Sequence, residues 1–151
     1  MPTLDVDWFD LELAFRDTTG TDNYLDTQTG DIVSVVAGFA DEKELRGVLL
    51  KDPQRFVHLP PLTAVDARRF MGQFIDSIEA GYMKRRLQSQ RHGAGSLTRC
   101  VAILRTEPAM LSRYHRFEQS AFWEFVEGFL RDHGVVPADR APTVDLFEGL
   151  G

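Results

Sequence analysis

Hydrophobic residues recur at helical spacing from the start of the chain. The first stripe stands among acidic neighbours and consists of Leu4, Trp8, Leu11 and Phe15. Positions three or four residues apart fall on one face of a helix. The pattern predicts a short helix over residues 4–16 that turns its acidic face outward and ends before Gly20.

The stretch NYLDTQTGDIVSVV, residues 23–36, changes to the alternation that is typical of strands. A short strand and a second strand rich in β-branched residues flank a Thr-Gln-Thr-Gly turn, which predicts a hairpin with Gly30 at a positive φ. In RFVHLPP, Phe56 and His58 share one face of a strand, and Val57 and Leu59 share the other. Because a lone hairpin is marginal in water, we expect one antiparallel sheet of three strands.

Helical patterns follow on both sides of the third strand. ADEKELRGVLL predicts a helix that stops near Pro53. Thr63 is a natural N-cap with Asp66 three residues later, close to a capping box. The stripe of the helix that it opens is Ala67, Phe70, Met71, Phe74 and Ile78.

Two shorter helices are separated by the loop RHGAG. The first covers residues 82–90, and the second begins at Ser96, which we expect to be its N-cap. The inner face of the second helix is Leu97, Cys100, Val101 and Leu104.

A long helix begins near Pro108 and ends before Gly134, as the positional preferences of proline and glycine indicate. It has one aromatic stripe and a second apolar stripe roughly opposite, formed by Trp123, Val126 and Leu130. The two stripes together make the apolar part of the helix circumference wider than a helix with one buried face needs. We therefore expect the second stripe to be covered, either by the N-terminal helix or by a partner chain.

These elements predict an α+β fold in which a three-stranded antiparallel sheet, a hairpin plus one strand, packs with five or six helices. The 151 residues fit a single domain, which we assign to residues 1–136. Residues 137–151 contain two prolines and no periodicity, so we expect an extended or mobile C-terminal tail.

Charge is strongly segregated along the chain, whose formal net charge is −6. Residues 1–82 carry 7 basic and 15 acidic side chains, net −8, whereas residues 83–116 carry 8 basic and 1 acidic, net +7. Residues 117–151 carry 2 basic and 7 acidic, net −5. The acidic total argues against a general nucleic-acid coat, and the central region remains a candidate basic patch.

The stretch RRLQSQRHGAGSLTR places arginines around a glycine-rich turn that leads into a helix. Such a turn exposes backbone N–H groups and the positive end of the helix dipole, so it attracts anions. The predicted anion-binding residues are Arg85, Arg86, Arg91, Gly93, Gly95, Ser96 and Arg99. The alternative is that these arginines pair with the protein's own acidic surfaces.

No other group of residues predicts catalysis, a metal site or a cofactor. The four histidines, His58, His92, His115 and His133, are dispersed and lack metal-ligand spacing. Asp26 and Asp31 could face each other across the hairpin as an acid/base or cation pair, although aspartates beside a turn commonly bond to their own backbone. Cys100 lies on an apolar stripe, which favours an inert buried thiol.

The sequence shows a single cysteine, no apolar leader and no apolar run long enough to span a membrane. These features favour a cytoplasmic protein that makes no contact with a membrane. The sequence leaves the oligomeric state open, a homodimer included.

Five segments resemble a bacterial family known as uncharacterised protein family 0158. They are NYLDTQTGDIVSV, RFVHLPP, ARRFMGQFIDSIE, GAGSLTR and FLRDHGV, and the likeness covers about residues 4–136. The resemblance implies a small α+β domain and no particular activity. Members of that family have two aromatic residues after the glycine-rich turn, whereas this chain has Leu97 and Cys100 there, neither of which offers a ring for stacking.

The leading hypothesis is a non-catalytic cytoplasmic binding or regulatory module whose basic region, residues 84–116, contacts an acidic partner, either nucleic acid or protein. One alternative is an enzyme acting on a small phosphorylated or carboxylated ligand held at residues 93–99. Another is a self-associating structural protein that uses the stripe of Trp123, Val126 and Leu130.

Overall fold

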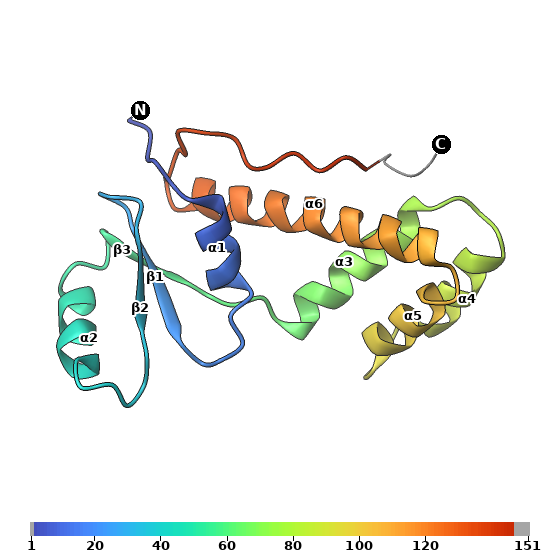
Figure 1. Ribbon diagram of the computed structural model, residues 1–151, viewed down its shortest axis with the longest axis horizontal. Helices are drawn as coiled ribbons and strands as arrows, with labels where there is room; N and C mark the ends of the chain where they lie inside the picture. Colours follow the sequence, from blue (N-terminus) through green and yellow to red (C-terminus); the bar gives the residue numbers. More distant parts are fainter. Residues whose placement is uncertain (1, 147–151) are drawn as a thin grey trace. The chain divides into compact units, whose positions relative to one another are not determined.

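The structure, a computed structural model, describes residues 2–146. Its helices and strands follow one another as α1 (Trp8–Phe15), β1 (Asp22–Asp26), β2 (Ile32–Val35), α2 (Glu42–Lys51), β3 (Phe56–Leu59), α3 (Ala64–Ser77), α4 (Tyr82–Gln90), α5 (Ser96–Leu104) and α6 (Pro108–Asp132). A three-stranded antiparallel sheet and six helices within the described residues confirm the predicted α+β class (Figure 1).

The described residues form two compact units. The first lies within Met1–Leu62 and Phe125–Pro142, and the second lies within Thr63–Glu124 and Thr143–Gly151. The first unit holds the sheet, and the second holds α3, α4, α5 and the first part of α6. The assignment of one domain to residues 1–136 stays a prediction.

The sheet of the first unit has the order β2-β1-β3, with the central strand antiparallel to both neighbours. Tyr24 pairs with Val33 on one side and with His58 on the other, which places all three on the same face. Gly30 has φ +84°, and an added Cβ would overlap the backbone carbonyl of Asp5. The predicted hairpin, third strand and glycine conformation are therefore confirmed.

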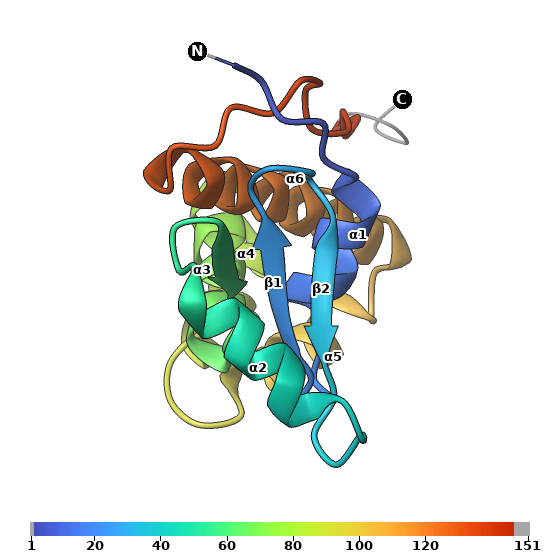
Figure 2. The same ribbon diagram turned by 90° about the vertical axis from the view of Figure 1, so that its left-hand side faces the viewer.

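Helix α2 covers the face of the sheet that carries Tyr24. Figure 2 shows α2 in front of β1 and β2. Its Leu49 is buried, as is Val35 at the end of β2, and Arg46 reaches Asp22 on β1 at 3.0 Å. Exposed apolar residues remain on its outer side, Leu50 among them at 79% exposure.

Helix α1 is shorter than predicted, because it begins at Trp8 rather than at residue 4. The Asp7 carboxylate accepts the backbone N–H groups of Phe9 and Asp10, which fixes the N-cap there. Leu4 instead pairs with Pro137 in an isolated parallel bridge. Besides its acidic residues, the outer face of α1 exposes two large apolar side chains, Phe9 and Leu13.

The second unit is a helical cluster. Figure 1 shows α3, α4 and α5 together, and all three pairs of helices are in contact. The predicted capping box at Thr63 and Asp66 is present. Phe74 of α3 packs edge-on against Tyr114 and Phe117 of α6, with ring centroids 5.4 and 5.5 Å apart. Met71, Phe74 and Ile78 from the α3 stripe share one buried cluster with Cys100 and Leu104 from the α5 stripe.

The last turns of α6 belong to the first unit. Phe15 of α1 lies edge-on to Phe125 and Phe129, at centroid distances of 5.8 and 5.3 Å. After the helix, Gly134 has φ +71°, and Val135 donates its backbone N–H to the carbonyl of Leu130. This is the glycine-terminated helix end that the sequence predicts.

The segment after α6 contains no helix among its described residues. Leu4 donates to the carbonyl of Val136 at 2.7 Å, and Ala138 donates to the carbonyl of Leu4 at 2.8 Å. These two bonds fasten the start of the predicted tail to the N-terminal segment. The part of the predicted tail beyond Leu146 lies outside the described residues.

Candidate anion-binding site

The loop between α4 and α5 turns on two glycines. Gly93 and Gly95 have φ +87° and +76°, a left-handed conformation that other residues rarely adopt. The backbone N–H of Ser96 donates to the carbonyl of Gly93 at 3.2 Å. The glycines predicted to bind an anion thus have a structural reason to be glycine.

Arg99 fastens this loop from the first turn of α5. Its guanidinium donates to the backbone carbonyls of Ala94 at 2.7 Å and His92 at 3.0 Å, and to Oε1 of Gln90 at 3.0 Å. Three acceptors of the chain itself therefore engage Arg99. These acceptors are two carbonyls and an amide oxygen, so Arg99 holds the loop itself and does not pair with an acidic surface of the protein.

The prediction that Ser96 is an N-cap is wrong. Gly95 occupies the N-cap position, and Ser96 is the first residue of α5. The Ser96 side chain is buried at 2% exposure, and its Oγ has no hydrogen-bond partner among the described residues. Because Gly95 takes the N-cap position, α5 begins one residue earlier than expected, and the Ser96 hydroxyl is buried in the interior.

Arg91, at the end of α4, crosses to α3. Its Nη1 lies 2.7 Å from Oδ1 of Asp76, and its Nη2 donates to the carbonyl of Gly72 at 3.3 Å. The Arg91 guanidinium lowers the pKa of Asp76. A Cβ added at Gly72 would lie 2.9 Å from Arg91 Nη2, so glycine in the middle of α3 leaves room for the guanidinium.

A pocket of about 430 Å³ lies beside this contact, within the second unit. Gly72, Asp76 and Arg91 form one part of its wall. The other lining residues are Val65, Arg68, Arg69, Gln73, His92 and Gly93. Two of the predicted anion-binding residues, Arg91 and Gly93, therefore line a concave site together with α3.

The charges around this pocket do not cancel. Arg91 is paired with Asp76, and Arg69 is paired with Asp66 at 3.1 Å. Arg68 has no hydrogen bond or ion pair to another described residue. Three arginines against two carboxylates leave one positive charge, and Arg68 carries it.

The sequence reasoning missed Arg68, Arg69 and Gly72 as site residues. A signal was available, since residues 68, 72 and 76 are spaced by four and so fall on one face of α3. Arg68 and Asp76 are exposed on that face. A mid-helix glycine between two exposed charged residues suggests the close approach of another group.

Arg85 and Arg86 stand apart from the pocket lining. Arg85 is exposed and has no partner among the described residues. The Arg86 guanidinium lies 5.5 Å from the ring centroid of Tyr82, a cation–π contact along α4. Only Arg91 and Gly93 of the seven predicted residues line the pocket.

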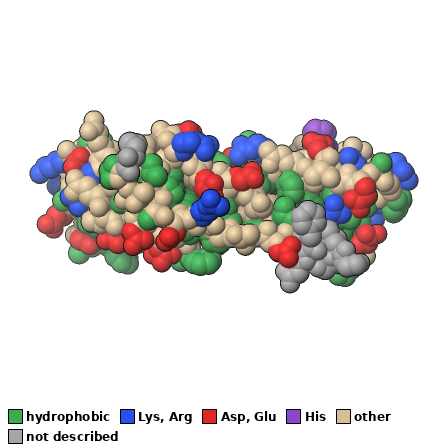
Figure 3. All heavy atoms as spheres, turned by 90° about the horizontal axis from the view of Figure 1, so that it is seen from above, with side chains coloured by type: hydrophobic (Ala, Val, Ile, Leu, Met, Phe, Trp, Pro, Cys, Tyr) green, Lys and Arg blue, Asp and Glu red, His purple; other side chains and the backbone are tan. Residues whose placement is uncertain are grey.

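Much of the basic region is paired with the protein's own acceptors. Arg113 lies 3.2 Å from a carboxylate oxygen of Glu79, and Lys84 reaches the carbonyl of Ile78 at 3.1 Å. On the face that Figure 3 shows, Lys and Arg side chains alternate with Asp and Glu. The described part of that face therefore carries positive and negative side chains together and no purely basic patch.

The apolar stripe of Trp123, Val126 and Leu130 is buried, at 4%, 0% and 0% exposure. The stripe is therefore covered, as its width predicts. A partner chain would have no access to these side chains in this conformation. The partner-binding role assigned to them is thus without support from their exposure.

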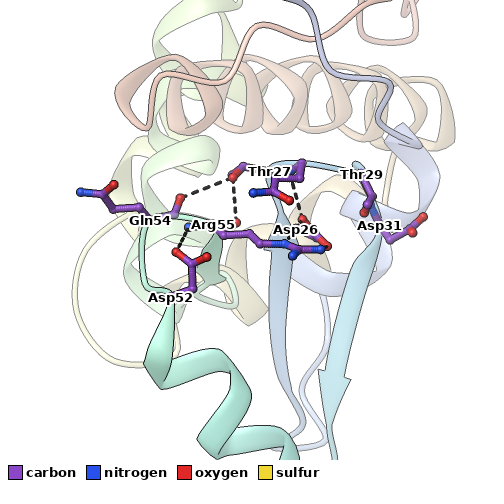
Figure 4. Close-up of polar contacts among 8 residues, drawn as sticks. Asp26, Thr27, Thr29, Asp31, Asp52, Gln54 and Arg55 are labelled. Carbon is purple, nitrogen blue, oxygen red and sulfur yellow. Dashed lines mark hydrogen bonds and ion pairs between the residues drawn. The ribbon is translucent and has the colours of Figure 1, made fainter.

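The Asp26 carboxylate pairs with Arg55 rather than with the Asp31 carboxylate, although the Asp26 backbone N–H donates to the Asp31 carbonyl at 2.9 Å. Arg55 donates from Nε to Oδ1 at 3.0 Å and from Nη2 to Oδ2 at 2.9 Å (Figure 4). The hydrogen bonds from Arg55 lower the pKa of Asp26 to about 2. Figure 4 shows the Asp31 side chain directed away from Asp26. We name the two hydrogen bonds between Asp26 and Arg55 the fork; it joins the hairpin turn to the start of β3. Asp26 and Asp31 therefore do not face each other as an acid/base pair.

Cys100 is fully buried, and burial raises the pKa of its thiol. A thiol with a raised pKa that solvent does not reach is a poor nucleophile. Within residues 2–146, no cluster of histidine, cysteine and acidic side chains has the arrangement of a metal site. None of the helices in that range is long and apolar enough to cross a membrane.

Comparison with known proteins gives a family and no activity. The model of the uncharacterised protein family UPF0158 matches residues 3–144. The chain is 27% identical over 150 residues to the UPF0158 protein PA5073 of Pseudomonas aeruginosa, covering 99% of this chain and 95% of that protein. No solved structure matches. The match over nearly the whole length shows that the chain belongs to the uncharacterised protein family UPF0158.

Proposed function

We propose that the protein is a non-catalytic binding module that takes a phosphate group of an anionic partner into the pocket beside Arg68, Arg91 and Gly93. The observation that carries the proposal is the uncompensated charge of Arg68 in a concave site of about 430 Å³. Arginine guanidinium groups bind phosphate oxygens with paired, charge-assisted hydrogen bonds.

A phosphate suits this pocket better than a carboxylate does. Arg91 already holds the carboxylate of Asp76, which is 64% exposed and can move away into solvent. A dianionic phosphate offers more acceptor oxygens and more charge than Asp76, so it can compete for Arg91 while it also neutralises Arg68. The basic region, residues 84–116, contributes Arg91 to this contact, and α3 contributes Arg68.

One observation favours the alternative of an enzyme acting on a phosphorylated ligand, namely that Asp76 and His92 both line the pocket. A general base must be positioned and must have a pKa near the working pH. Arg91 lowers the pKa of Asp76, which makes the carboxylate a weaker base. His92 has no hydrogen-bonded side-chain partner among the described residues that would orient its ring. Binding is therefore the better-supported function.

The test is calorimetric titration of the full chain with inorganic phosphate, with pyrophosphate and with a short single-stranded oligonucleotide. Arg68→Ala should weaken phosphate binding about tenfold or more. Arg85→Ala, an exposed arginine outside the pocket lining, is the matched control and should leave phosphate binding unchanged.

The salt dependence separates a small ligand from a nucleic acid. A single phosphate contact gives a shallow slope of log affinity against log salt, whereas a polynucleotide that engages several arginines gives a steep one. Absence of binding to all three probes, or equal losses in Arg68→Ala and Arg85→Ala, would contradict the proposed pocket.

A further inference from the structure

Helix α1 has a second apolar side. It buries Trp8, Leu11, Ala14 and Phe15. Phe9 and Leu13, four residues apart on its outer side, are 65% and 72% exposed. Residues at this spacing are neighbours on a helix, so the two side chains form one exposed apolar surface. We name Phe9 and Leu13, together with Asp10 between them, the α1 surface.

Carboxylates lie beside the Phe9 end of the α1 surface. A hollow of about 500 Å³ opens beside Phe9, and Asp5, Asp7, Asp10 and Asp31 line it. No lysine or arginine is among the residues that line this hollow. A partner that fits must therefore bring apolar or aromatic area together with positive charge.

The chain carries a surface of this composition on α4. Tyr82 is 66% exposed, and the guanidinium of Arg86 lies over its ring at 5.5 Å. Arg85 is exposed beside them and has no partner among the described residues. Tyrosine and arginine are among the residue types enriched at the energetically dominant positions of protein interfaces. We name Tyr82, Arg85 and Arg86 the α4 surface.

We propose that the α1 surface of one molecule binds the α4 surface of a second copy of this chain. The evidence is the complementarity of the two surfaces: apolar side chains among aspartates on one, and an aromatic side chain among arginines on the other. The charge segregation of the chain, net −8 over residues 1–82 and net +7 over residues 83–116, supports the same pairing. Because the two surfaces differ, each molecule offers one of each.

Sedimentation velocity of the full chain, from micromolar to near-millimolar concentration, tests the proposal. We expect the average mass to rise with concentration at about 0.1 M salt, and the association to weaken at about 1 M salt, where the screening length falls to about 3 Å. A monomer at every concentration in about 0.1 M salt would overturn the proposal.

Substitutions assign the contact to the two surfaces. Leu13→Ser should weaken association about tenfold. Leu50, on α2, is exposed to a similar extent, and Leu50→Ser should leave association unchanged. Equal effects of the two substitutions, or no effect of Leu13→Ser, would overturn the assignment. Arg68→Ala should leave association unchanged, which keeps this test separate from that of the phosphate pocket.

Charge exchange gives the sharpest result. Asp10→Arg and Arg85→Glu should each weaken self-association of the variant about tenfold or more, because each sets like charges opposite one another. A mixture of the two variants should associate again, since each then meets a complementary surface. Failure of the mixture to associate while both variants remain folded by circular dichroism would overturn the pairing of α1 with α4.

Discussion

The guanidinium of Arg91 occupies the space that a Cβ at Gly72 would fill, with Nη2 only 2.9 Å from that position. Glycine in a helix interior costs about 0.5–1 kcal/mol relative to alanine. The contact with Arg91 gives a structural reason for the glycine at this position of α3. It also sets the geometry of the proposed phosphate pocket, because Arg91 and Gly72 both line it.

Gly72→Ala should therefore weaken phosphate binding while it leaves the free energy of unfolding nearly unchanged. Alanine favours the helix but displaces Arg91 from Asp76 and Gly72, so we expect the free energy of unfolding to change by less than about 0.5 kcal/mol and phosphate binding to weaken severalfold. Gly47→Ala in α2, where a Cβ meets nothing within 4 Å, is the control. It should stabilise the protein by about 0.5–1 kcal/mol without affecting binding. Urea unfolding and calorimetry measure the two quantities.

Asp76→Asn tests whether Asp76 competes with the ligand for Arg91. Removing its negative charge frees the guanidinium and makes the pocket more positive, so the affinity for inorganic phosphate should rise about threefold to tenfold. Asp66→Asn is unsuitable as a control because Asp66 completes the capping box. Asp52→Asn, outside the pocket, serves instead. A fall in affinity would show that Asp76 helps to hold the ligand.

The elements of the fold were predictable because their signals are local. Strand alternation, the turn ending in Gly30 and the Thr63 capping box each depend on residues close together in the sequence. The start of α1 was missed because Leu4 continues the helical spacing, whereas a distant residue, Pro137, pairs with it. The spacing of apolar residues along the sequence does not show that a contact with a distant residue keeps Leu4 outside the helix.

The pocket was predicted only in part, for a similar reason. The arginine-rich loop is recognisable in the sequence because its residues are contiguous. In the structure, however, Arg99 donates to the loop's own carbonyls and Ser96 is buried. Arg68 lies 23 positions before Arg91, and only the packing of α3 against α4 and α5 brings both to one pocket. Sequence spacing carries no information about that packing.

Arg99→Ala should destabilise the protein more than Arg85→Ala does. Arg99 donates to three acceptors that hold the glycine loop against α5, whereas Arg85 has none among the described residues. We expect a loss of about 1–2 kcal/mol in the free energy of unfolding for Arg99→Ala and a change within about 0.5 kcal/mol for Arg85→Ala. Similar melting temperatures for the two variants would contradict the clamping role of Arg99.

The pair of Asp26 and Arg55 predicts how stability changes in acid. Arg55 lowers the pKa of Asp26 from 3.8 to about 2. A carboxyl group with a lowered pKa in the folded state stabilises the protein above its unfolded pKa, and this contribution is lost as the pH falls from about 4 through about 2. Since the Arg55 side chain is 34% exposed, we reduce the expected contribution to about 1 kcal/mol.

Asp26→Asn should remove this part of the pH dependence. At pH 7 the variant should be less stable by about 1–3 kcal/mol, because the substitution removes the charge of the nearly buried Asp26 and weakens its fork with Arg55. Between about pH 4 and pH 2 its free energy of unfolding should fall by about 1 kcal/mol less than that of the natural protein. Asp31→Asn is the matched control, since its exposed side chain lies outside the fork, and should be neutral within about 0.5 kcal/mol. Parallel pH profiles for the natural protein and Asp26→Asn, measured by urea unfolding, would show that the fork between Asp26 and Arg55 does not stabilise the hairpin turn.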